Sequence, residues 1–161
     1  MPDLKTILSA KQPLTLSGVP SGFQPAVLAD LARAAKGRAL FIAPDDAAMR
    51  AIAATAPYFA PDLQVIQFPA WDCLPYDRAS PTLRVMADRI AALHALQAKA
   101  PKDGARPQLF LTTANAASQR VVTPFRIRQL VATLAPGERI GRDDLAALLT
   151  ANGYVLSLIH I

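Results

Sequence analysis

The chain has 161 residues, of which 52% are hydrophobic and 18% are charged, so it is long and apolar enough to bury a core. Its formal net charge of +5 is spread almost evenly along the chain, whereas sequence-independent DNA binding needs clustered cations. We therefore interpret the charge as a contribution to solubility and treat a DNA-binding module as the weaker hypothesis.

The sequence also indicates in which cellular compartment the protein is found. No apolar run approaches the ~20 residues of a membrane-spanning helix, and the N-terminus lacks the basic-then-apolar order of a secretory signal. The single cysteine, Cys73, excludes an internal disulfide and fits a reducing environment. These features predict a cytoplasmic protein with no membrane partner.

In chain order, residues 1–13 are expected to be a loose lead-in, after which short apolar runs alternate with stretches of helical periodicity. Strands are predicted at 14–16, 38–43, 63–68 and 108–112. Helices are predicted at about 25–35, 46–56 and 81–98, with a short one ending near 119–120. Strands that alternate with helices favour an α/β fold, with a parallel sheet covered by helices on both faces.

The pattern changes after Pro124. A strand is predicted at 127–134, a turn at 135–138 and a helix at 142–152, with Gly153 at its end. This segment does not continue the regular alternation that precedes it.

The stretch from Phe68 to Pro81 is the most distinctive part of the chain, because it holds the only tryptophan, the only cysteine and three prolines. Proline fixes φ and donates no hydrogen bond, so neither a helix nor a central strand can run through it. We predict an ordered loop whose apolar side chains pack against the fold. Trp71 and Tyr76 could instead stack on a base or fill a partner's pocket, but anchoring of the loop is favoured.

The residue types that recur at fixed spacing in this loop are Phe68, Pro69, Trp71, Asp72, Leu74, Pro75, Tyr76, Asp77, Ser80 and Pro81. Further signature residues stand at 89–90, 109–113, 119–121, 124, 142–145 and 153–154. Over residues 14–156, the chain resembles the transcription-repair coupling factors of the Mfd family, in the N-terminal module that they share with the excision-repair protein UvrB.

The resemblance implies a domain organisation. Residues 14–124 would form a RecA-like, UvrB-homology domain of the P-loop NTPase type. Residues 125–156 would begin a small inserted α+β domain that binds UvrA, cut short in this chain. The last residues, 157–161, do not match the family's continuation and are expected to be an artificial tail.

The resemblance also implies a function for a longer parent protein. That parent would be an ATP-dependent translocase on double-stranded DNA that displaces stalled RNA polymerase and recruits UvrA in nucleotide excision repair. ATP and Mg²⁺ would bind to motor domains outside this chain. We expect this fragment to be non-catalytic, with no cofactor of its own.

The loop before the first long helix occupies the place of a phosphate-binding loop. A working loop needs G-x-x-x-x-G-K-[ST], in which the lysine pairs with the terminal phosphates and the hydroxyl holds Mg²⁺. Here Pro25 follows, and neither the lysine nor the hydroxyl stands at its place. We interpret the loop as a degenerate one, although an ordinary glycine turn or an independent enzyme domain with a divergent phosphate loop are alternatives. Its residues are Gly18, Ser21, Gly22, Phe23 and Gln24.

Other candidate chemistry is weaker. Cys73 and the nearby carboxylates would need a base, and neither His94 nor His160 stands in a suitable place. One cysteine and two distant histidines also give no metal-ligand spacing. We therefore predict no catalytic residue and no metal site.

Four arginines fall in the segment that the resemblance assigns to the UvrA-binding domain. Arginine is favoured at interfaces, but the resemblance places the main contacts beyond residue 161. We expect these arginines to be solvated or peripheral, and UvrA binding by this chain to be weak or absent. They are Arg126, Arg128, Arg139 and Arg142.

Overall fold

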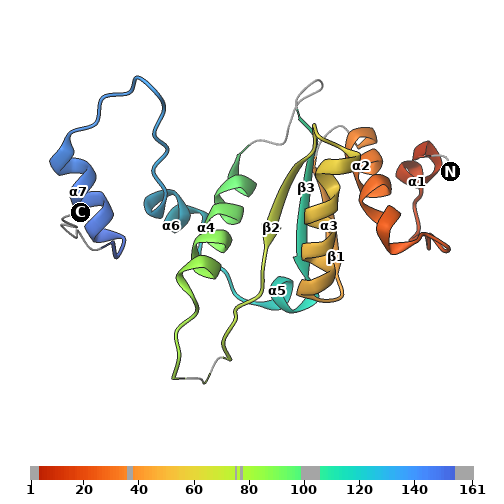
Figure 1. Cartoon of the computed structure of the whole chain (residues 1–161), viewed down its shortest axis with the longest axis horizontal. Coiled ribbons are helices and arrows are strands. Elements are labelled where there is room, and N and C mark those ends of the chain that lie inside the picture. Colours follow the sequence, from red (N-terminus) through yellow and green to blue (C-terminus); the bar gives the residue numbers. More distant parts are fainter. Residues whose placement is uncertain (1–3, 36–37, 75, 77, 99–105, 155–161) are drawn as a thin grey trace.

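The computed structural model describes residues 4–35, 38–74, 76, 78–98 and 106–154, which form helices around a small sheet (Figure 1). The helices are α1 (Leu4–Ser9), the 3-10 turn η1 (Ser21–Phe23), α2 (Gln24–Ala34), α3 (Asp46–Phe59), α4 (Leu83–Gln97), α5 (Ala114–Ser118), α6 (Pro124–Leu130) and α7 (Arg142–Ala151). The strands are β1 (Arg38–Ala43), β2 (Gln64–Phe68) and β3 (Gln108–Thr113).

The three strands are parallel and lie in the order β1-β3-β2. Gln108 at the start of β3 lies opposite both Arg38 of β1 and Gln64 of β2, so the three strands begin level with one another. Parallel neighbours need crossover helices, which α3 and α4 supply. The predicted α/β class and parallel sheet are confirmed.

Helices pack on both faces of the sheet. On one face, α2 and α3 cover a core of alanines and larger residues that includes Met49, Ile52, Leu109 and Leu111. On the other face, α4 covers a second core, whose buried members are Ile66, Phe68, Ala70, Ala92, Phe110 and Ala116. Leu40 and Ile42 of β1 remain 62% and 51% exposed, so the second face is only partly covered.

Side-chain caps explain where several helices begin. Asp45 accepts from the amide of Ala48 at 2.7 Å and starts α3 at Asp46, the residue at which the predicted helix 46–56 begins. Three threonines cap α4, α5 and α6 in the same way. They are Thr82, Thr113 and Thr123.

Two predictions near the N-terminus are wrong. Residues 14–16 form no strand, since no described strand lies beside them and Leu14 and Leu16 are exposed. Alternating apolar residues over so short a run do not make a strand without a partner to pair with. In addition, the expected loose lead-in contains helix α1, Leu4–Ser9.

The strand predicted at 127–134 is also wrong, because its first half belongs to helix α6. Apolar and charged residues alternate from Phe125 to Arg128, which is the period of a strand. However, the Thr123 hydroxyl caps the helix and Pro124 stands in its first turn, which favours helix. Ile127 is then buried, and α6 packs against α4.

The C-terminal helix α7 matches the prediction for 142–152 and lies apart from the sheet in Figure 1. Gly153 has φ of 85°, and the amide of Tyr154 donates to the carbonyl of Leu149 at 3.0 Å. A glycine in this left-handed conformation is a common helix end. The expected tail at 157–161 lies outside the described residues.

Candidate functional site

The site is built around Arg89, which projects from α4 and is only 2% exposed. Its guanidinium carbon lies 4.1 Å from the ring centroid of Phe68 and 4.1 Å from that of Trp71. Both aromatic residues belong to the start of the proline-rich loop, and Phe68 ends β2. The cation is therefore in contact with two electron-rich ring faces.

Hydrogen bonds fix this guanidinium in place. Nη1 of Arg89 donates to the carbonyl oxygen of Pro69 at 2.6 Å and to Oε1 of Gln119 at 3.0 Å. The same Oε1 accepts from the amide of Trp71 at 3.3 Å. Gln119 thus joins the segment after α5 to both α4 and the loop.

The charge of Arg89 is stabilised without an acid. No carboxylate in the described part of the chain forms an ion pair with it. Burial lowers the pKa of Arg89, but a guanidinium stays protonated in proteins at neutral pH. Carbonyl oxygens and ring faces therefore offset the loss of hydration that the buried charge incurs.

Asp72 connects the loop to the N-terminus of α4. Its carboxylate accepts from the Thr82 hydroxyl at 2.6 Å and from the Thr82 amide at 3.2 Å. The hydroxyl also accepts from the amide of Val85 and so caps the helix. Hydrogen bonding by Thr82 holds the pKa of Asp72 below its usual range, so the group is an anion in a structural contact.

The chain is similar in sequence to known transcription-repair-coupling factors. No family model matches it. It is 30% identical over 155 residues to a transcription-repair-coupling factor from Myxococcus xanthus, a match that covers 91% of the chain and 12% of that protein. It is also 32% identical over 90 residues to the transcription-repair-coupling factor of Haemophilus influenzae, covering 56% of the chain and 7% of that protein.

This chain is related to the transcription-repair coupling factors. It spans about a tenth of the length of the curated relatives that it matches. The cluster around Arg89 brings together three segments on which the resemblance to these proteins was based: the proline-rich loop, the Arg89–Ile90 pair and Gln119.

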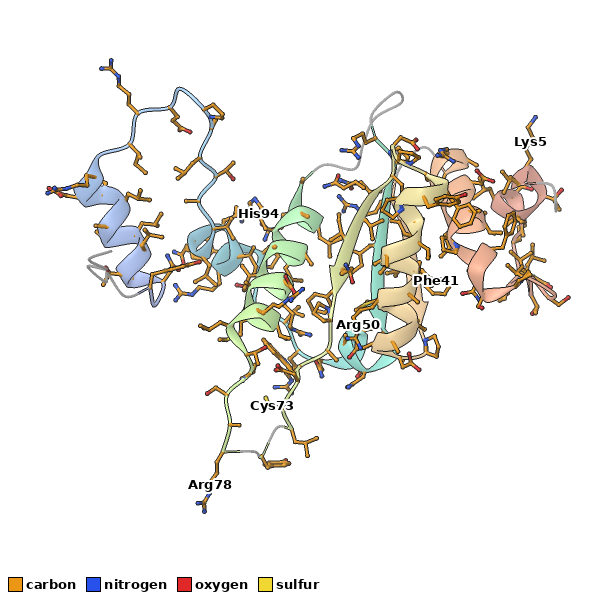
Figure 2. The ribbon with its side chains drawn as sticks, viewed as in Figure 1. Lys5, Phe41, Arg50, Cys73, Arg78 and His94 are labelled. Atoms are coloured by element: carbon orange, nitrogen blue, oxygen red, sulfur yellow. The ribbon has the colours of Figure 1, made fainter. Side chains whose placement is uncertain are left out.

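The remainder of the signature loop does not pack as predicted. Leu74 is 70% exposed and Tyr76 is 98% exposed, although their apolar character predicted burial. Figure 2 shows Arg78 at the far tip of this loop, pointing away from the sheet. The loop is anchored near its two ends, at Trp71 and Thr82, and the described residues Leu74, Tyr76 and Arg78 between them are exposed. Pro75 and Asp77 lie outside the described residues.

The loop at 18–24, interpreted from the sequence as a degenerate phosphate-binding loop, leads into α2 but follows no described strand. Gly18 has φ of 73°, a conformation that favours glycine. Ser21 to Phe23 form the turn η1, and the ring of Phe23 packs edge-to-face against Phe59 at 6.1 Å. The ring of Phe23 thus lies at the start of α2 and contacts the end of α3.

Other groups weighed as catalytic or metal-binding are not gathered into one site. Cys73 is half-buried, and His94 lies on α4, with its Nδ1 buried and without a hydrogen-bond partner among described residues. Figure 2 shows Cys73 and His94 well separated along α4 and the loop. In the described ranges, no three His, Cys, Asp or Glu side chains are close enough to hold a metal ion. Nor is any helix there both long and apolar enough to cross a membrane.

The four arginines of the C-terminal segment are exposed and do not share one contact. Arg126 donates to Gln129 at 3.1 Å within α6, and Arg128 donates to Gln97 of α4 at 3.2 Å. Arg142 lies 3.2 Å from Asp143 with its side chain 94% exposed. Arg139 lies in the irregular segment before α7.

The role of Arg89 is the part of the site that sequence reasoning missed. The sequence marked Arg89 and Gln119 as signature residues but assigned neither a contact. One signal was available, because Arg89 stands beside Ile90 in a helix whose apolar residues recur at helical spacing. A charge at the margin of such a stripe is a candidate for burial with partners.

Proposed function

We propose that this chain is a UvrB-like module of a transcription-repair coupling factor, one that recognises a partner and does not turn over nucleotide. The observation that carries the proposal is the Arg89 cluster. It holds three signature segments together by one buried cation, and it leaves no acid-base pair for chemistry. A cluster of this kind, held together without reacting groups, suits a structural or docking role.

In this proposal, residues 14–124 are the RecA-like part with a degenerate phosphate loop. The parallel sheet supports a fold of this type, and the absent lysine and hydroxyl support the loss of phosphate binding. Residues 125–156 begin the inserted domain. The exposed, irregular segment between α6 and α7 supports the assignment of α7 to that domain, whereas α6 packs against α4 of the first part.

The proposal extends to the longer parent protein. The name of the relatives, transcription-repair-coupling factor, supports a role in linking transcription to DNA repair. The parent would be an ATP-dependent translocase that acts on double-stranded DNA and stalled RNA polymerase. This module would contribute to recruitment of UvrA, with the segment that starts at residue 125 on the docking side.

Titration of UvrA against the full-length coupling factor that contains this sequence tests the recruitment role. We expect deletion of residues 131–154, which leaves α6 and its packing against α4 in place, to lower the affinity for UvrA by at least about tenfold, which is ~1.4 kcal/mol. The isolated chain is expected to bind UvrA weakly or not at all.

The matched control replaces all four exposed arginines of the segment by alanine in the same full-length protein. Peripheral charges contribute little to affinity, so a change within about threefold is expected. Unchanged affinity after the deletion would contradict the recruitment role. A tight complex with the isolated chain would contradict the placement of the main contacts outside it.

A further inference from the structure

The outer edge of β2 is one of the two edges of the sheet, the other being that of β1. A groove of about 650 Å³ runs along it, between α3 on one face and α4 on the other. Strand residues Val65, Ile66 and Gln67 line its floor. The small side chains Ala91 and Ala95 of α4 line one wall, and Arg50 of α3 stands on the other.

The backbone of β2 presents free hydrogen-bonding groups to this groove. The amide of Gln64 donates to the carbonyl of Pro107 at 2.9 Å, so Gln64 faces β3. Backbone groups of successive residues in a strand point to opposite sides, so Ile66 also faces β3 while Val65 and Gln67 face outward. These outward groups have no partner among the described residues, because β2 is the last strand of the sheet.

This edge lacks the features that usually protect a sheet edge. Natural edge strands carry lysines, prolines or bulges that discourage pairing with another chain. The strand Gln-Val-Ile-Gln-Phe has no charge and no proline, and its register with β3 is continuous. Such an edge suits strand addition, in which backbone hydrogen bonds supply the affinity.

The charge of the groove indicates which kind of strand it would take. Arg50 forms no ion pair in the described part of the chain, and Arg84 has only a weak contact with Asp88, at 3.9 Å. Figure 2 shows Arg50 near the end of the sheet where α3 begins, and Arg84 stands in the first turn of α4. Two arginines and one carboxylate, Asp88, line the groove, so its excess charge is positive and an acidic strand would complement it.

We propose that the β2 edge binds an extended peptide segment of a partner protein that carries a carboxylate beside an alternating apolar run. The backbone of Val65 and Gln67 pairs with the added strand, and Arg50 receives the carboxylate. This inference concerns a surface separate from the segment proposed to dock UvrA, so either can fail without the other.

Amide hydrogen exchange on the whole chain, with the peptide acetyl-Glu-Thr-Val-Thr-Val-Thr-Glu-amide as probe, tests the proposal. We expect exchange at Val65 and Gln67 to slow by about tenfold at saturation, because their amides become hydrogen-bonded. Exchange at Ile66 should not change, since its amide is already paired with β3. A peptide with lysine in place of both glutamates should bind about tenfold more weakly.

Two variants sharpen the test. Gln67→Pro removes the outward amide without disturbing the pairing with β3, and it should abolish binding, while Gln67→Ala should retain it. Arg50→Glu should reverse the preference between the acidic and basic peptides. Unchanged exchange at Val65 and Gln67 in the wild-type chain would overturn the proposal. Slowing that depends on protein concentration without peptide would overturn it in favour of self-pairing.

Discussion

Replacing Arg89 by alanine is expected to lower the free energy of unfolding by about 3 kcal/mol. The change removes two hydrogen bonds from a charged donor, to Pro69 and Gln119, and leaves a gap between the rings of Phe68 and Trp71. Relief of the buried charge offsets part of the loss. Urea denaturation should show a lower midpoint with an unchanged slope.

Arg89→Met is the matched control, because it keeps the length and apolar packing of the stem without the charge. We expect it to cost about half as much as Arg89→Ala, since it loses the hydrogen bonds but leaves little empty space. If the midpoint of Arg89→Ala equals that of the wild type, then the cluster does not hold the three segments together.

Trp71→Ala should lower the free energy of unfolding by about 2 kcal/mol, which is less than a fully buried tryptophan would lose. The ring is half-buried, and one face contacts the guanidinium of Arg89 at 4.1 Å. The loss therefore combines the cation-π contact with part of the apolar burial. The same urea titration measures it.

Trp71→Phe retains an aromatic face over Arg89 and is expected to cost less than half as much as the alanine change. Combining Trp71→Ala with Arg89→Ala gives a second check. Residues in contact couple by ~0.5–3 kcal/mol, so the double variant should lose less than the sum of the single losses. Simple additivity would show that the ring and the cation stabilise the fold independently.

Much of the fold could be predicted because local signals agreed with one another. The apolar run 38–43 ends at Pro44, and Asp45 caps the next helix, so both boundaries were marked in the sequence. The strand at 63–68 is followed by Pro69, and the strand at 108–112 by Thr113, which caps α5. These signals act within a few residues and need no distant partner.

The errors arose where a short pattern depended on a distant partner. Residues 14–16 have the alternation of a strand, yet no described strand pairs with them. Leu74 and Tyr76 have apolar side chains, yet both are largely exposed. At 124–130, the helix cap of Thr123 outweighed the alternation of Phe125 to Arg128.

The site was predictable as a set of residues but not as a geometry. The fixed spacing in the proline-rich loop identified Trp71 and Asp72, and the same comparison marked Arg89 and Gln119. Their contact requires β2, α4 and the segment after β3 to meet at one edge of the sheet, which only the tertiary structure shows. A sequence pattern does not report which carbonyl a buried cation will meet.

The most direct test of the central claim is nucleotide turnover by the chain itself. Purified protein is incubated with Mg-ATP while phosphate release is followed, and its thermal unfolding is recorded with and without the nucleotide. We expect no release above the blank and no shift, because Phe23 and Gln24 follow Gly22 where a phosphate-binding loop has its lysine and hydroxyl. Hydrolysis, or stabilisation approaching the ~2.7 kcal/mol given by a ligand at about 100 times its Kd, would contradict the account.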